Sequence, residues 1–106
     1  MTNKIVVLTT CSTVEEAEKI ARHLVESRVA ACVSLSSPVR SIYRWKGAVE
    51  DASEIALTIK SRRDLWPQLE AALRKVHPYD VPEMLALPVV EGLPAYLDWL
   101  DQELAG

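Results

Sequence analysis

The feature that most constrains the fold is a long hairpin pattern centred on Lys46-Gly47. Before this dipeptide, Tyr43 and Trp45 share one face of an extended strand, because side chains alternate with a period of two. After it, apolar and polar residues alternate again over Glu54–Lys60. The alternation on both sides and the tight turn between them predict two long antiparallel strands.

The length of this hairpin limits how the chain can pack. An arm from Val33 to Trp45, at about 3.3 Å per residue, would reach roughly 40 Å. A compact domain of this size has a radius of gyration of about 13 Å and hence a diameter of about 33 Å. The hairpin must therefore bend sharply or project beyond its own core. Because a projecting aromatic ribbon with open edges aggregates unless a partner covers it, the sequence predicts a homo-oligomer assembled through edge strands.

Hydrophobic periodicity and capping signals predict the remaining elements. Strands are predicted at Lys4–Cys11, Arg28–Ser36 and Met84–Val90, the last with Pro88 at an edge of the sheet. One helix follows the first strand and is capped by Ser12 or Thr13, and a second covers Ser61–Val76 with Asp64 as its N-cap. A last helix starts at Gly92-Leu93-Pro94.

The order strand, helix, strand, strand, helix, strand is that of two split βαβ units, which form an antiparallel sheet with two helices on one face. We therefore expect an α+β fold, a ferredoxin-like βαββαβ antiparallel sheet with a long β-hairpin and an extra C-terminal helix. Residues 1–106 form one domain in this prediction. Many functions occur on this topology, so it does not decide the activity.

Charge and cysteine usage exclude several classes of function. Fifteen acids against 12 bases give a net charge of −3, which does not support binding to nucleic-acid phosphates. No apolar run approaches the roughly 20 residues of a membrane span. Cys11 and Cys32 lack CxxC spacing, so we expect free thiols rather than a disulfide. Together these features predict a cytoplasmic protein that binds neither nucleic acid nor membranes.

The segment His77–Glu83 concentrates side chains that carry chemistry. It holds an imidazole, a phenol and two carboxylates, and its two prolines stiffen the backbone. His77 is expected at the C-terminal end of a helix, where the helix dipole favours a protonated imidazole. With Asp80 and Glu83 it offers one nitrogen and two carboxylates to a metal. The alternative is structural: His77 and Asp80 satisfy backbone groups of the loop, and Glu83 pairs with a base at a subunit contact.

Several stretches resemble the CutA divalent-cation tolerance family, and together they cover nearly the whole chain. They are Glu16–Ala21, Arg28–Val33, Ser41–Gly47, Glu54–Lys60 and His77–Glu83. The resemblance implies a ferredoxin-like homotrimer in which long hairpins exchange contacts between subunits. Members of this family look architecturally similar to the trimeric PII signalling proteins and are associated with divalent metals, notably copper.

The resemblance also implies a metal site, which can be carried over residue by residue. The family's copper ligands include a cysteine at the end of the first strand and histidines before a Pro-Tyr pair. His77 matches one of these histidines, whereas Val76 occupies the preceding position. The family's cysteine falls at Thr9, and Cys11, two residues later, faces the same side by the strand period. The candidate metal ligands are therefore His77, Cys11 and Glu83.

Three functions follow as hypotheses. The first is a homotrimeric divalent-cation tolerance protein that requires no cofactor and binds Cu(II) or another divalent cation weakly. The second is a PII-like trimeric scaffold that binds a small ligand or a partner protein in its subunit cleft, where Lys60, Arg62 and Arg63 could hold an anion. The third is an enzyme with His77 as general base. Because the chain has no nucleophile elbow, phosphate loop or paired zinc motif, we do not expect an enzyme.

Overall fold

The computed structural model describes residues 1–106 and contains five strands and three α-helices. The strands are β1 (Lys4–Cys11), β2 (Cys32–Leu35), β3 (Val39–Trp45), β4 (Ala48–Arg62) and β5 (Leu85–Pro88). The α-helices are α1 (Val14–Glu26), α2 (Trp66–Val76) and α3 (Pro94–Glu103), and a single 3₁₀ turn, η1 (Arg63–Leu65), precedes α2.

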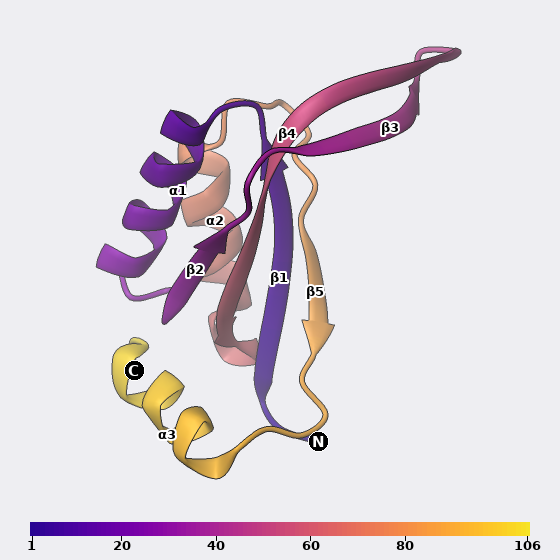
Figure 1. Cartoon of the computed structure of the whole chain (residues 1–106). Coiled ribbons are helices and arrows are strands. Elements are labelled where there is room, and N and C mark those ends of the chain that lie inside the picture. The colour runs from indigo at the N-terminus through magenta and orange to yellow at the C-terminus, as the bar shows by residue number, and fades with distance from the viewer.

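The main sheet has the strand order β2-β4-β1-β5, and all of its pairs are antiparallel. Helices α1 and α2 lie on the same side of this sheet (Figure 1). This arrangement confirms the predicted ferredoxin-like α+β fold. None of the helices is both long enough and apolar enough to span a bilayer.

The core lies between this sheet and the two helices. Alternate residues of the central strands, such as Val7 in β1 and Ile59 in β4, are fully buried and face the helices. Ile20 and Leu24 from α1 and Leu69 from α2 close the same cluster. Burial of such side chains contributes about 1.5–3 kcal/mol each. The apolar stripes predicted for both helices are therefore the surfaces that hold the helices on the sheet.

The other face of the sheet is not covered by a helix (Figure 1). Paired residues of antiparallel strands point to the same side, so Val6 and Leu87 form one row and Leu8 and Leu85 the next. Leu85 is 56% exposed and Leu87 is 47% exposed. We call these four residues the open sheet face. When helices cover one face of a sheet and the second face is apolar, the second face is normally buried as well.

The predicted hairpin is confirmed, and it projects from the body of the molecule (Figure 1). Strand β3 pairs with the N-terminal half of β4, from Val39 opposite Glu54 to Trp45 opposite Ala48. Lys46 and Gly47 form a two-residue turn with positive φ angles of 49° and 82°, as a type I′ hairpin turn requires. The molecule measures 44 × 25 × 24 Å along its principal axes. The hairpin therefore extends beyond the core, as its length predicts.

The second strand is shorter than the predicted Arg28–Ser36. Strand β2 begins only at Cys32, because the preceding residues end α1 instead of joining the sheet. The backbone N–H groups of Val29 and Ala30 both donate to the Leu24 carbonyl, and Arg28 has a positive φ of 61°. Val29 and Ala30 are buried, so their apolar character reflects packing in a turn and not strand pairing.

The second helix begins later than the predicted Ser61. Strand β4 continues to Arg62, and α2 starts at Trp66 with Leu65 at the N-cap position and no side-chain cap. The prediction that Asp64 caps this helix is wrong, because its carboxylate accepts a hydrogen bond from Arg62 Nε at 2.7 Å. The last strand is also shorter than the predicted Met84–Val90, but it is the edge strand that Pro88 indicated.

A network of ion pairs fixes α3 at one end of the sheet. The Asp101 carboxylate accepts hydrogen bonds from Arg62 Nη1 at 3.0 Å and from Lys4 Nζ at 3.1 Å. Arg62 Nη2 also donates to the Ala105 carbonyl at 2.6 Å. The Arg62 and Lys4 side chains are 9% and 6% exposed, respectively. Because partly buried charges are costly to leave unpaired, Asp101 contributes to the docking of α3, beside the buried Leu100 and Leu104.

We expect stability to fall at acid pH through Asp101. Its hydrogen bonds to Arg62 and then Lys4 hold the pKa of the Asp101 carboxyl below its usual value. A depressed folded-state pKa contributes stability above the unfolded pKa of about 3.9 and loses it as the pH falls through the folded value. Urea unfolding of Asp101→Asn should therefore show a smaller loss of stability below about pH 4 than the unmodified chain.

Asp98→Asn is the matched control, because Asp98 is exposed on the same helix and makes no ion pair. This variant should keep the acid dependence of the unmodified chain. Identical pH profiles for Asp101→Asn and the unmodified chain would show that the network does not hold α3.

Candidate functional site

His77 ends α2 and lies buried against β1. Pro78 prevents the helix from continuing, and His77 is the C-cap residue with 7% of its surface exposed. Its Nε2 lies 2.8 Å from the Thr10 carbonyl oxygen, and its Nδ1 accepts a hydrogen bond from the Tyr79 N–H at 3.1 Å. An imidazole whose Nδ1 accepts is neutral and donates through Nε2. His77 thus bonds two backbone groups, as the structural interpretation expects of this residue, and its role toward a metal stays a prediction.

Tyr79 connects three segments of the chain through its hydroxyl group. The Tyr79 hydroxyl donates to Glu54 Oε2 in β4 at 3.1 Å, and the Ser12 hydroxyl in the β1–α1 turn lies 2.6 Å from the Tyr79 hydroxyl oxygen. Its ring packs edge-on against His77, with centroids 4.8 Å apart. Burial raises the pKa of the Tyr79 phenol; the Ser12 hydrogen bond lowers it, and Glu54 raises it further. We call Ser12, Glu54, His77 and Tyr79 the Tyr79 cluster.

Cys11 lies at the end of β1, beside this cluster. Cys11 and Thr9 are both buried on the helix-facing side of the strand, which confirms that the two side chains share a side. The Cys11 thiol donates to the Thr13 carbonyl at 3.5 Å. Burial raises the pKa of this thiol, and the nearby Glu16 carboxylate raises it further. Thr9 Oγ1 is also buried but has no hydrogen-bond partner.

Glu83 is exposed in the segment between α2 and β5. No group of three or more His, Cys, Asp or Glu side chains in the structure is arranged to hold a metal ion, so His77, Cys11 and Glu83 do not form one ligand set. Copper is bound by a thiolate and by an imidazole nitrogen with a free lone pair. The Cys11 thiol is stabilised in its protonated form, and both ring nitrogens of His77 are hydrogen-bonded. These residues do not fit a preformed metal centre.

The links made by Tyr79 were missed by the sequence reasoning. Tyr79 is separated by 67 residues from Ser12 and by 25 from Glu54 along the chain. Periodicity shows only that Glu54 alternates with apolar neighbours, not what its carboxylate meets. The only available signal was that a phenol adjoins His77 in a proline-stiffened loop.

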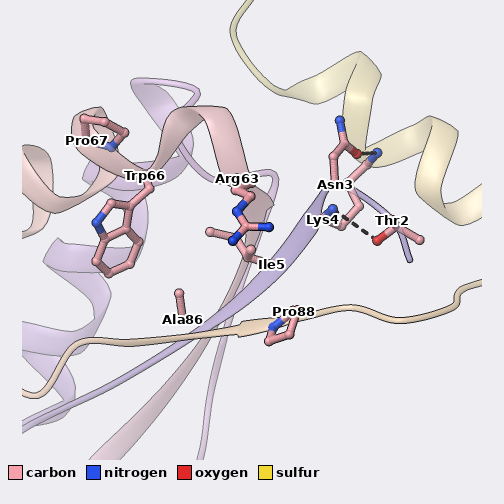
Figure 2. A pocket seen from close by; sticks show the side chains of 9 residues that line it. All are labelled: Thr2, Asn3, Lys4, Ile5, Arg63, Trp66, Pro67, Ala86 and Pro88. Atoms are coloured by element: carbon pink, nitrogen blue, oxygen red, sulfur yellow. Dashed lines mark hydrogen bonds between the residues drawn. The ribbon is translucent and has the colours of Figure 1, made fainter.

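The three basic residues predicted to hold an anion lie in different surroundings. Arg62 is committed to its ion pairs, and the Lys60 ammonium lies 3.9 Å from the Cys32 sulfur. Arg63 instead faces a pocket of about 460 Å³ between the start of α2 and β5 (Figure 2). This pocket is lined by Thr2, Asn3, Lys4, Ile5, Arg63, Trp66, Pro67, Ala86 and Pro88. None of the predicted metal ligands lines it.

Known proteins share this fold and much of this sequence. Residues 5–103 match the family model described as CutA1 divalent ion tolerance protein. The chain belongs to the CutA1 family. It is 46% identical over 95 residues to the divalent-cation tolerance protein CutA of Thermus thermophilus, and the match covers 90% of this chain and 92% of the relative.

Solved structures agree with this assignment. The divalent cation tolerance protein Cut A1 of Thermus thermophilus superposes with a TM-score of 0.93 and 43% identity, over 96% of this chain and 99% of that one. The structure named periplasmic divalent cation tolerance protein CutA, from Archaeoglobus fulgidus, superposes with a TM-score of 0.90 and 34% identity, over 94% and 97% of the two chains.

A mouse relative, protein CutA, is 48% identical over 93 residues, which are 88% of this chain but 52% of that protein. The chain therefore spans about half the length of the mouse protein.

Removing the hydroxyl group of Tyr79 should destabilise the protein. Tyr79→Phe keeps the ring but removes the bonds to Ser12 and Glu54, and we expect the unfolding free energy to fall by about 1–3 kcal/mol. Glu18→Gln is the control, because Glu18 is exposed on α1, away from the ribbon and the open sheet face, and should change stability by less than about 0.5 kcal/mol. Urea unfolding at one protein concentration measures both variants. Equal effects would mean that the Tyr79 hydroxyl does not hold the three segments together.

Proposed function

We propose that this chain is a homotrimeric divalent-cation tolerance protein. The observation that carries this proposal is the uncovered apolar surface of a member of this family: the open sheet face and the projecting β3–β4 ribbon both lack a partner within the chain. Trp45 is 57% exposed on the ribbon. Surfaces of this kind mark sites of association in proteins that remain in solution. Three copies that exchange ribbons would cover both surfaces.

Trp45→Ala should weaken the assembly more than Trp99→Ala. Trp45 stands on the ribbon, whereas Trp99 is 38% exposed and stacks on Tyr96 of its own helix, with ring centroids 5.7 Å apart. Aromatic residues that anchor an interface contribute about 2 kcal/mol or more, so the dissociation constant should rise by about 30-fold or more for Trp45→Ala. Sedimentation equilibrium measures both constants. Equal values for the two variants would exclude the ribbon as the anchor.

We further propose that copper(II) binds this chain only weakly and that His77 supplies a nitrogen ligand. Coordination through Nδ1 requires His77 to release its hydrogen bond from the Tyr79 N–H, whereas the Nε2 bond to the Thr10 carbonyl can remain. A neutral hydrogen bond contributes about 0.5–1.5 kcal/mol, so its loss weakens binding roughly 2- to 13-fold relative to a free imidazole. The raised pKa of the Cys11 thiol also weakens copper binding, because the thiolate is the form that binds metal.

Calorimetric titration with copper(II) tests this assignment. His77→Gln should lose the weak binding, and His23→Gln is the matched control because His23 is the only other histidine and lies on α1. Loss of binding in His23→Gln with retention in His77→Gln would contradict the proposal. A tight, stoichiometric complex of the unmodified chain would also contradict it, because the hydrogen-bonded state of His77 is incompatible with a preformed centre.

We also place the protein in the cytoplasm. The support is that Cys11 and Cys32 are free thiols, the state that a reducing compartment maintains. Fractionation of cells that express the full chain tests this location. Recovery from an extracytoplasmic fraction would contradict it.

A further inference from the structure

The pocket beside Arg63 lies on the opposite side of the sheet from the open sheet face. Ala86 pairs with Val7 and Pro88 pairs with Ile5, and both partners are buried on the helix-facing side. Leu85 belongs to the open sheet face. Paired residues share a side, so Ala86 and Pro88 look away from the surface that assembly would cover. A ligand in this pocket therefore does not compete with assembly through the open sheet face.

The charge of the pocket is positive. Its lining contains Lys4 and Arg63 but no Asp or Glu. The Lys4 ammonium is held by Asn3 Oδ1 at 2.6 Å and by Asp101. Arg63 is exposed, and the four ion pairs of the structure do not include it. Its guanidinium group is thus available to an anion, which it can bind through two parallel hydrogen bonds.

Apart from the polar residues Thr2 and Asn3, the rest of the lining is apolar and includes flat side chains. Figure 2 shows Trp66 and Pro67 at the start of α2, with Ala86 and Pro88 on the strand across from them. Trp66 is half-buried, so part of its indole ring remains free. The volume of about 460 Å³ falls within the range of roughly 300–1,000 Å³ found for small-molecule sites, which combine apolar walls with a few polar groups.

We propose that this pocket binds a small flat organic anion, an aromatic or heterocyclic ring that carries a carboxylate, sulfonate or phosphate group. Arg63 binds the anionic group. Trp66 and Pro88 contact the faces of the ring, because aromatic rings prefer such apolar, polarisable surfaces. The proposal requires neither the copper site nor the trimer, so its failure and theirs are separate results.

A matched pair of probes separates charge from shape. 2-Naphthoate carries the ring and the anion, and 2-naphthamide carries the same ring without the charge. Each is titrated into the ¹⁵N-labelled full-length chain, and the indole N–H of Trp66 and the amides of Asn3 and Ala86 are followed by NMR. We expect saturable shifts at these positions with 2-naphthoate, with a Kd of about 1 mM or tighter, and binding by 2-naphthamide at least tenfold weaker.

Variants assign the charge to one residue. Arg63→Gln should weaken 2-naphthoate binding by about tenfold to a hundredfold and leave 2-naphthamide binding unchanged, as expected for loss of a charge-assisted hydrogen bond. Arg22→Gln, an exposed arginine on α1, controls for net charge and should bind like the unmodified chain. Trp66→Leu should weaken both probes. Because Trp66 also packs on the core, its spectrum must first show a folded protein, and the Arg63 result stands without it.

Three results would overturn the proposal. The first is equal affinity for the anionic and neutral probes. The second is an equal loss of 2-naphthoate binding in Arg63→Gln and Arg22→Gln, or no loss in either. The third is the absence of saturable shifts at the pocket. Shifts that appear only on the open sheet face count as this result.

Discussion

The rest of the structure depends on the continuity of β4. This strand runs for 15 residues without a break, but its two halves have different partners. Residues 55–62 pair with β1, and residues 57–60 also pair with β2, whereas residues 48–54 pair only with β3. A single strand that serves both the core and the projecting ribbon makes the ribbon an extension of the sheet. The exposure of the ribbon follows from this geometry.

The two ends of the part of β4 that pairs with β1 are flanked or occupied by charged residues, Glu54 and Arg62, each of which binds a segment outside the sheet. Glu54 accepts the Tyr79 hydroxyl and so ties the α2–β5 loop to the base of the ribbon. Arg62 binds Asp101 and Ala105 and so ties α3 to the far end. Since β4 lies between β2 and β1, these contacts reach the centre of the fold. His77 is therefore a structural residue first, and its role toward metals is limited by the bonds it already makes.

Local sequence patterns predicted those parts of the fold that local forces determine. β1 has the predicted bounds, because a β-branched run is followed at once by a helix cap at Thr13. The turn at Lys46-Gly47 is marked by Gly47, which adopts a positive φ readily, whereas Lys46 takes its positive φ only within the type I′ turn. The second strand was predicted too long because buried apolar residues near Val29 look alike in a turn and in a strand.

The candidate site was harder to predict for a different reason. The hydrogen-bonding state of His77, the partners of Tyr79 and the pairing of Arg62 all depend on residues far away in the sequence. The resemblance to the family led to the prediction that His77 contacts a metal, but it does not show that both of its ring nitrogens are hydrogen-bonded. Likewise, a run of basic residues does not reveal which one stays unpaired. Only the folded structure shows that Arg63 makes no ion pair, whereas the adjacent Arg62 is paired.

The central claim is that the open sheet face and the ribbon are covered by further copies of the chain. Light scattering on the protein as it elutes from a sizing column at micromolar concentration measures the molar mass directly. The account predicts a single species of three times the chain mass of 11.8 kDa. A species with the mass of one chain would contradict it, because the apolar face and the aromatic ribbon would then remain in water.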